Sequence, residues 1–152
     1  MAAPEVYSVH DDTPQKGWEH FEHTADVGLR VTGRDLRELL EHAADGFIEL
    51  MVDPETVPEE RSVDVCCTGE DAEELLVTWL EEILFRFEAE RLAPARAEIV
   101  TLDGYNLQAR IYGETFDERK HTVRDVLKAV TYHNLEVRRR GDRLEASIVI
   151  DV

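Results

Sequence analysis

The chain has 152 residues, 43% of them apolar, which suffices for one domain that folds around its own core without needing a metal or a disulfide. Its 34 acidic residues outnumber its 17 basic residues, and the net charge of -17 disfavours a stand-alone nucleic-acid-binding role. An acidic surface with only three lysines is also typical of proteins that work in molar salt, where screening weakens this argument from charge. We therefore expect a halophilic source.

Residues 1–16 contain two prolines and lack hydrophobic periodicity, so we predict a flexible N-terminal extension followed by a single domain over residues 17–152. No signal-peptide pattern occurs, and no run approaches the roughly 20 apolar residues of a membrane helix, so we expect a cytoplasmic protein without membrane contact. The adjacent Cys66 and Cys67 would point to opposite faces of a strand. We expect buried free thiols in a reducing compartment.

The domain begins with two predicted strands and a helix. Trp18–Glu22 and Val27–Thr32 have strand-like patterns, and His23–Asp26 interrupts them as a bulge or tight bend. From Asp35 to Met51, apolar residues recur at spacings of three and four, which predicts an amphipathic helix with one face to bury.

A short strand and a second helix follow. Val63, Val65 and Cys67 alternate with polar residues, which indicates a strand. Asp71 is followed three residues later by Glu74, the spacing of a capping box, and the apolar stripe behind it predicts a helix that ends near residue 90.

The remainder is predicted to be mostly strand, around a polar irregular segment over residues 116–125. Strands are expected over Ala97–Thr101, Leu107–Ile111, Lys128–Val137 and Leu144–Val152. Asp103-Gly104 is a hairpin turn signal, and we interpret Arg138–Asp142 as a second hairpin loop. The element order predicts an α+β fold: a two-layer sandwich with a mixed, mostly antiparallel sheet and two main helices packed on one face.

The bend near the start contains several residues that can bind metals. Its titratable residues are Glu19, His20, Glu22, His23 and Asp26. Neighbouring residues of an extended strand point to opposite faces, so these side chains cannot all converge on one ion without the bend. The alternative is a half-solvated strand in which Asp26 serves the turn before Gly28.

The C-terminus offers a second group of oxygen ligands. Asp151 is the penultimate residue, so its carboxylate lies beside the terminal carboxylate of Val152, and calcium and magnesium prefer such ligands. A solvated chain end is the simpler interpretation. Spacing alone does not pair Asp26 with Asp151, because 125 residues separate them.

Basic residues late in the chain are candidates for partner contact. Lys128 begins a predicted strand and could meet an anion, although an edge lysine often protects a sheet from aggregation. Lys120-His121 lies in the irregular segment, and Arg138–Arg140 would be a charged hairpin tip or a small basic patch. The sequence lacks a phosphate-binding loop, a helical zinc pair and a nucleophile signature, which disfavours an enzyme.

Three segments in register resemble the archease family: His23–Gly28, Lys128–His133 and Ile148–Val152. The resemblance covers about residues 17–152. It implies a small accessory factor of the GTP-dependent ligase that joins tRNA exon halves, a factor that promotes guanylylation and multiple turnover of that ligase. The family has also been linked to chaperoning a tRNA methyltransferase. Contact with tRNA would be indirect, through the ligase.

The resemblance also implies a site. Asp26 matches the first metal-binding aspartate of the family, Asp151 the second, and Val152 the terminal residue that supplies a further oxygen, with calcium as the expected ion. The family fold would bring the first strand and the C-terminus together. The site would then present a metal to the ligase or organise a surface that the ligase recognises.

The remaining candidates match the family less closely. His23, Lys120, His121 and Lys128 are predicted to contact the partner. A metal-dependent phosphoesterase or nuclease that uses the same carboxylates, and a chaperone of an RNA-modifying enzyme, are the alternative functions.

Overall fold

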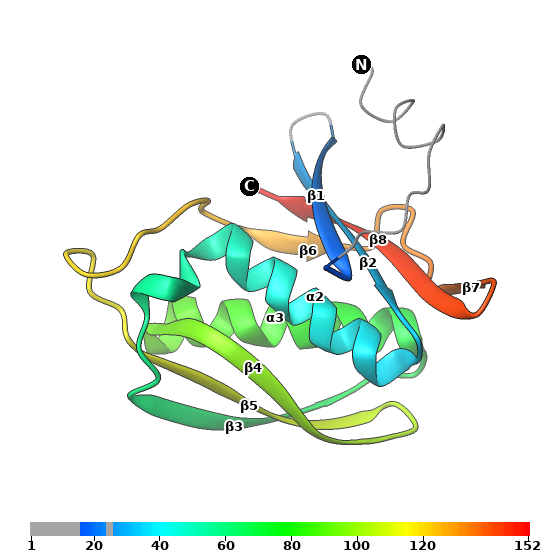
Figure 1. The fold of residues 1–152 in the computed structure, drawn as a ribbon, viewed down its shortest axis with the longest axis horizontal. Helices are drawn as coiled ribbons and strands as arrows, with labels where there is room; N and C mark the ends of the chain where they lie inside the picture. The colour runs from blue at the N-terminus through cyan, green and yellow to red at the C-terminus, as the bar shows by residue number, and fades with distance from the viewer. Residues whose placement is uncertain (1–15, 24–25) are drawn as a thin grey trace.

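The strands form two antiparallel sheets in the computed structural model, which describes residues 16–23 and 26–152 (Figure 1). One sheet has the order β1-β2-β8-β6, with β7 also paired to β8, and the other has the order β3-β5-β4. The strands are β1 Trp18–His23, β2 Asp26–Gly33, β3 Arg61–Thr68, β4 Leu92–Asp103, β5 Asn106–Thr115, β6 Ala129–Thr131, β7 Arg138–Arg140 and β8 Arg143–Asp151. The predicted extension over residues 1–16 lies outside the described residues, apart from Lys16.

Two helices, α2 (Leu36–Met51) and α3 (Ala72–Glu90), lie between the two sheets, and a short 3₁₀ helix, η1 (Pro54–Thr56), follows α2 (Figure 1). Helix α2 contacts β2 and β4, and α3 contacts β3, β4 and β6, so each helix touches strands of both sheets. The predicted α+β sandwich is confirmed. Neither helix is long and apolar enough to cross a membrane within the part of the chain that is described.

The arrangement of the layers differs from the predicted single sheet covered on one face. The buried residues of α2 are Leu39, Leu40, Ala43, Ala44, Gly46, Phe47, Ile48, Leu50 and Met51. They cover more of the helix than one stripe, so the helix requires apolar neighbours on more than one side. The second sheet supplies them: Ile99 of β4 and Ile111 of β5 are buried in the same core as Leu29 of β2 and Ile148 of β8.

Aspartate caps begin both helices, and the sequence predicts the one at Asp71. The side chain of Asp35 accepts a hydrogen bond from the backbone N–H of Glu38 at 2.9 Å, and Asp71 accepts one from Glu74 at 2.8 Å. Between the helices, the fully buried Trp79 of α3 donates from Nε1 to the carbonyl oxygen of Leu40 at 2.9 Å. This bond connects α3 to α2 inside the core.

The predicted hairpin after β4 is confirmed, because Asp103 pairs with Asn106 across a loop of two residues in which Gly104 has a φ of 60°. The predicted strand over Lys128–Val137 is too long. Only Ala129–Thr131 forms β6, because the chain then turns, with Asn134 at a φ of 52°.

Two further predictions are corrected. Arg138–Arg140 is strand β7 rather than part of a loop, and the turn is confined to Gly141 and Asp142, with Gly141 at a φ of 66°. Cys66 is exposed on β3 whereas Cys67 is buried, since consecutive strand residues face opposite sides. Burial raises the pKa of the Cys67 thiol to about 12.

Gly28 allows an aromatic ring to lie across β2. Phe21 of β1 is opposite Gly28, and a Cβ atom added to Gly28 would stand 2.3 Å from the Phe21 ring. We predict that Gly28→Ala lowers the free energy of unfolding, measured by urea denaturation, by about 1–3 kcal/mol because the ring must shift. In a Phe21→Ala background the same glycine substitution should cost much less. An equal loss in both backgrounds would show that ring contact is not the cause.

Candidate functional site

The pairing of β2 with β8 brings the two predicted metal-binding aspartates together. Val27 lies opposite Ile150 in this antiparallel pair. One further step in the same register places Asp26 opposite Asp151, and side chains of directly opposed residues share a face of the sheet. Because Ile150 is fully buried on the helix side, the alternation puts both aspartates on the other face, where each is half-buried.

Three more of the predicted residues, Lys128, Val152 and His23, lie at this end of the sheet. Ala129 of β6 is opposite Asp151, and the backbone N–H of Lys128 donates to the carbonyl oxygen of Asp151 at 2.8 Å. Val152 follows directly and packs against the edge of the core. On the other side, His23 of β1 pairs with Asp26. The structure therefore gathers residues from four strands into one row, although they are distant in sequence.

The chemistry of this group suits a hard cation. Among the residues that the structure describes, no hydrogen bond or ion pair engages the carboxylate of Asp26 or Asp151. Two aspartates and a nearby terminal carboxylate repel one another when ionised, and a calcium or magnesium ion prefers such oxygen ligands. No cluster of three His, Cys, Asp or Glu side chains is found in the described ranges, so the Val152 carboxylate or backbone oxygens must complete any metal site here.

Two other titratable residues near the bend, Glu19 and His20, have structural partners. Glu19 forms an ion pair with Arg30 at 2.9 Å. The Nε2 atom of His20 lies 3.2 Å from the carbonyl oxygen of Gly46 in α2, on the helix side of β1. His20 therefore does not belong to the group on the opposite face, and the alternation of the strand divides the predicted cluster.

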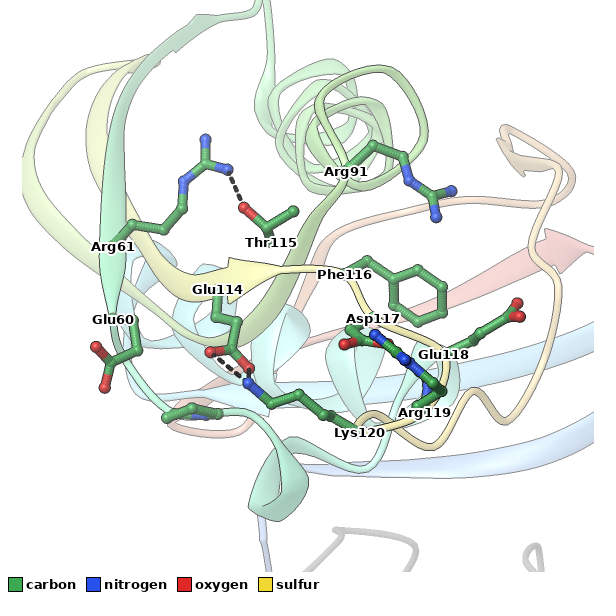
Figure 2. Close-up of a pocket in the computed structure, with 11 residues that line it drawn as sticks. Glu60, Arg61, Arg91, Glu114, Thr115, Phe116, Asp117, Glu118, Arg119 and Lys120 are labelled. Atoms are coloured by element: carbon green, nitrogen blue, oxygen red, sulfur yellow. Dashed lines mark hydrogen bonds and ion pairs between the residues drawn. The ribbon is translucent and has the colours of Figure 1, made fainter.

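Lys120 and His121 lie at a second location, beside a hollow of about 920 Å³ at the end of β5 (Figure 2). His121 is only 4% exposed. Its Nδ1 accepts from the backbone N–H of Asp117 at 2.9 Å, so Nε2 carries the proton that is donated to Glu114 at 2.6 Å. His121 thus supports the segment from beneath, and Lys120 is the member of the pair that reaches solvent.

Glu114 is the electrostatic centre of this second location. It accepts from His121 and also forms an ion pair with Lys120 at 3.2 Å. The hydrogen bond from His121, assisted by Lys120, holds the pKa of the Glu114 carboxyl below its usual value. The backbone N–H and the guanidinium of Arg119 likewise lower the pKa of Asp117.

Two arginines that belong to no sequence motif, Arg61 and Arg91, line the same hollow (Figure 2). Arg61 is the first residue of β3, and Arg91 follows the last residue of α3. An arginine at the boundary of an element is common, so its position carries no signal. Only the fold brings the start of β3 and the end of α3 to one place.

The lowered pKa of Glu114 predicts an acid-dependent loss of stability. The unfolded chain binds the proton more readily, so the contribution of Glu114 is complete well above pH 4.5 and is lost as the pH falls through its lowered folded-state pKa. Glu114→Gln should reduce the urea midpoint at neutral pH and make it fall less steeply in acid.

Glu118→Gln is the matched control for Glu114→Gln. Glu118 is an exposed carboxylate that lines the same hollow. Its variant should follow the wild-type pH profile. If the urea midpoints of Glu114→Gln and the wild type fell equally steeply in acid, Glu114 would not be the source of the acid-dependent loss of stability.

Residues 18–152 match the model of the Archease protein family (MTH1598/TM1083). The chain is 37% identical to Protein archease of Pyrococcus furiosus and 39% identical to Protein archease of Thermococcus gammatolerans, each over 139 residues. Each alignment covers 89% of this chain and 98% of the relative.

Two solved structures are similar to the fold. The solution structure of Methanobacterium thermoautotrophicum Protein 1598 has a TM-score of 0.76 at 33% identity and covers 91% of this chain and 100% of that one. A crystal structure described as an archease, "possible chaperone", from Thermotoga maritima has a TM-score of 0.60 at 23% identity and covers 88% of this chain and 96% of that one. The second likeness concerns the fold alone.

Proposed function

Since this chain belongs to the archease family, we propose that it is a metal-binding accessory factor that activates the GTP-dependent tRNA-splicing ligase. In this proposal it promotes guanylylation and multiple turnover of the ligase, and meets tRNA only through that partner. The observation that carries the proposal is the register of β2 and β8, which sets Asp26 opposite Asp151 beside the C-terminus. The names of its relatives suggest an accessory protein rather than a catalytic enzyme.

Asp26, Asp151 and the Val152 carboxylate are the residues that would hold the ion, with calcium as the proposed cation. Bound there, a hard cation would supply open coordination positions for oxygen atoms of a partner. The protein contributes rigidity, since β8 is paired to β2 on one side and to β6 on the other. The carbonyl of Asp151 is also held, by the N–H of Lys128. Asp26 and Asp151 therefore lie at the ends of paired strands, and Val152 directly follows β8.

Calcium binding predicts a stability change with a defined sign. In wild-type protein, calcium should raise the melting temperature, because a ligand at about 100 times its Kd stabilises the folded state by about 2.7 kcal/mol. Asp26→Asn and Asp151→Asn should remove this response. Neither substitution should destabilise the metal-free fold, because each relieves repulsion between carboxylates.

Differential scanning fluorimetry at low ionic strength, with calcium and with chelator, measures this effect. Asp142→Asn, which neutralises an exposed carboxylate in the turn before β8, is the matched control and should respond to calcium as the wild type does. A calcium-dependent rise that survives in both Asp26→Asn and Asp151→Asn would place the ion elsewhere.

The second prediction for this function concerns the partner. With limiting ligase, added wild-type protein should raise the number of joined tRNA halves per ligase molecule, whereas Asp26→Ala and Asp151→Ala should not, although circular dichroism shows both folded. The assay is run at physiological and at molar potassium chloride, because the acidic composition suits high salt. Absence of stimulation by wild-type protein under both conditions would overturn the proposal.

A chaperone role is the second candidate, because the Thermotoga maritima structure is described as a "possible chaperone". The client would be a tRNA methyltransferase, and the broad acidic surface would act in place of the carboxylate pair. Protection of the methyltransferase that survives removal of both aspartates would favour this candidate. A two-metal nuclease requires more converging ligands than the Asp26 and Asp151 pair provides.

A further inference from the structure

The hollow of about 920 Å³ lies where three strands of the second sheet meet: β3 begins, β5 ends and β4 begins there (Figure 2). Its volume is in the range of sites that bind ligands or peptide segments. The lining is mostly charged: Glu60, Arg61, Arg91, Glu114, Asp117, Glu118, Arg119 and Lys120. Such a lining favours a charged occupant. The ion pairs that these residues already form with one another indicate the sign of that occupant's charge.

Part of the charge in the hollow is already neutralised from within. Lys120 pairs with Glu114 at 3.2 Å, and Arg119 pairs with Asp117 at 3.3 Å. Within the described ranges of the chain, Arg61 and Arg91 have no carboxylate partner. In a protein with twice as many acidic as basic residues, two arginines that face one hollow without an acidic partner are a notable departure from the average surface.

Arg91 is held in place by aromatic stacking. It has a φ of 57° after the last turn of α3, and its guanidinium lies 4.9 Å from the centre of the Phe116 ring. The Phe116 ring packs edge-on against the Phe87 ring, with 5.4 Å between the ring centres, and its centre lies 5.7 Å from that of the His121 ring. Stacking occupies the face of the guanidinium and leaves its N–H edge available for a planar oxyanion.

Arg61 approaches from the neighbouring strand. Its Nη1 donates to the hydroxyl of Thr115 at 3.2 Å, which leaves its other N–H groups available. Thr115 pairs with Leu92, the residue after Arg91, so the two arginines reach the hollow on either side of the end of β5 (Figure 2). Each of the two exposed arginines thus has one contact within the protein, Arg61 with Thr115 and Arg91 with Phe116.

We propose that this hollow is a docking site for an acidic side chain of the protein partner, whose carboxylate binds the N–H edge of Arg91, while Arg61, on the other side of β5, binds a second acceptor of the same segment. This inference rests on the proposed function, because the partner is the ligase. A basic residue next to that acidic side chain would face Glu60 and Glu118, the exposed carboxylates of the lining. Charge complementarity thus specifies a segment of mixed sign.

The same features disfavour RNA as the occupant. Arg91, Phe87 and His121 surround the Phe116 ring, so it offers little free surface for a stacked base. Glu60 and Glu118 would repel successive phosphates, and the net charge of -17 acts in the same direction. A single carboxylate on a protein segment avoids both penalties.

The test measures affinity separately from maximal stimulation, using labelled ligase titrated with this protein. Arg61→Ala and Arg91→Ala should each raise the Kd for the ligase by on the order of 10-fold, while saturating concentrations restore wild-type stimulation. Arg139→Ala removes the same charge from β7, on the opposite side of the view in Figure 1, and should leave the Kd unchanged. Melting temperatures establish that all three variants are folded.

The outcomes separate this inference from the proposed function. If wild-type protein does not stimulate the ligase, the proposed function fails. If it stimulates the ligase and both arginine variants bind with the wild-type Kd, the docking site is wrong while the function stands. Binding of a single-stranded RNA oligonucleotide to this protein alone, lost in Arg91→Ala, would identify a nucleic-acid site and would also overturn the inference.

Discussion

The antiparallel register between β2 and β8 is the constraint on which the candidate site depends. Leu29 opposite Ile148 and Val31 opposite Ala146 are all buried against the helices, and this burial fixes the register. A slip of one residue would move these side chains to the outer face and carry Asp151 toward the core. The hydrophobic core therefore positions the carboxylates, even though they do not belong to it.

One irregular segment, residues 116–128, connects the hollow at the end of β5 to the end of the first sheet where Asp26 and Asp151 lie (Figure 1). It starts beside the hollow at Phe116 and ends at Lys128, which bonds the backbone of Asp151. Between these points the backbone N–H groups of Arg124 and Asp125 donate to the carbonyl oxygens of Met51 and Leu50, respectively, at the end of α2. The end of α2 therefore holds the middle of the segment.

The acidic composition does more than charge the surface. Two glutamates of α3 accept hydrogen bonds from the backbone of the following sheet: Glu81 from the N–H of Val130 at 2.7 Å and Glu73 from the N–H of Val137 at 2.8 Å. Val130 lies in β6, at the edge of the first sheet, and Val137 directly precedes β7. The carboxylates protect that edge while they connect it to α3. Composition alone predicts solubility but not this structural use.

The sequence by itself determined the local structure: helix periodicity, the cap at Asp71, strand alternation in β8 and the turn at Gly104. Each depends on residues close in the chain, and the three motifs added the family resemblance. Tertiary structure decided what depends on distant pairing: two sheets, the burial of His121, the hollow between Arg61 and Arg91, and Asp26 beside Asp151. Local patterns carry no register between segments 125 residues apart, because that register arises only when their buried faces pack on the same helices.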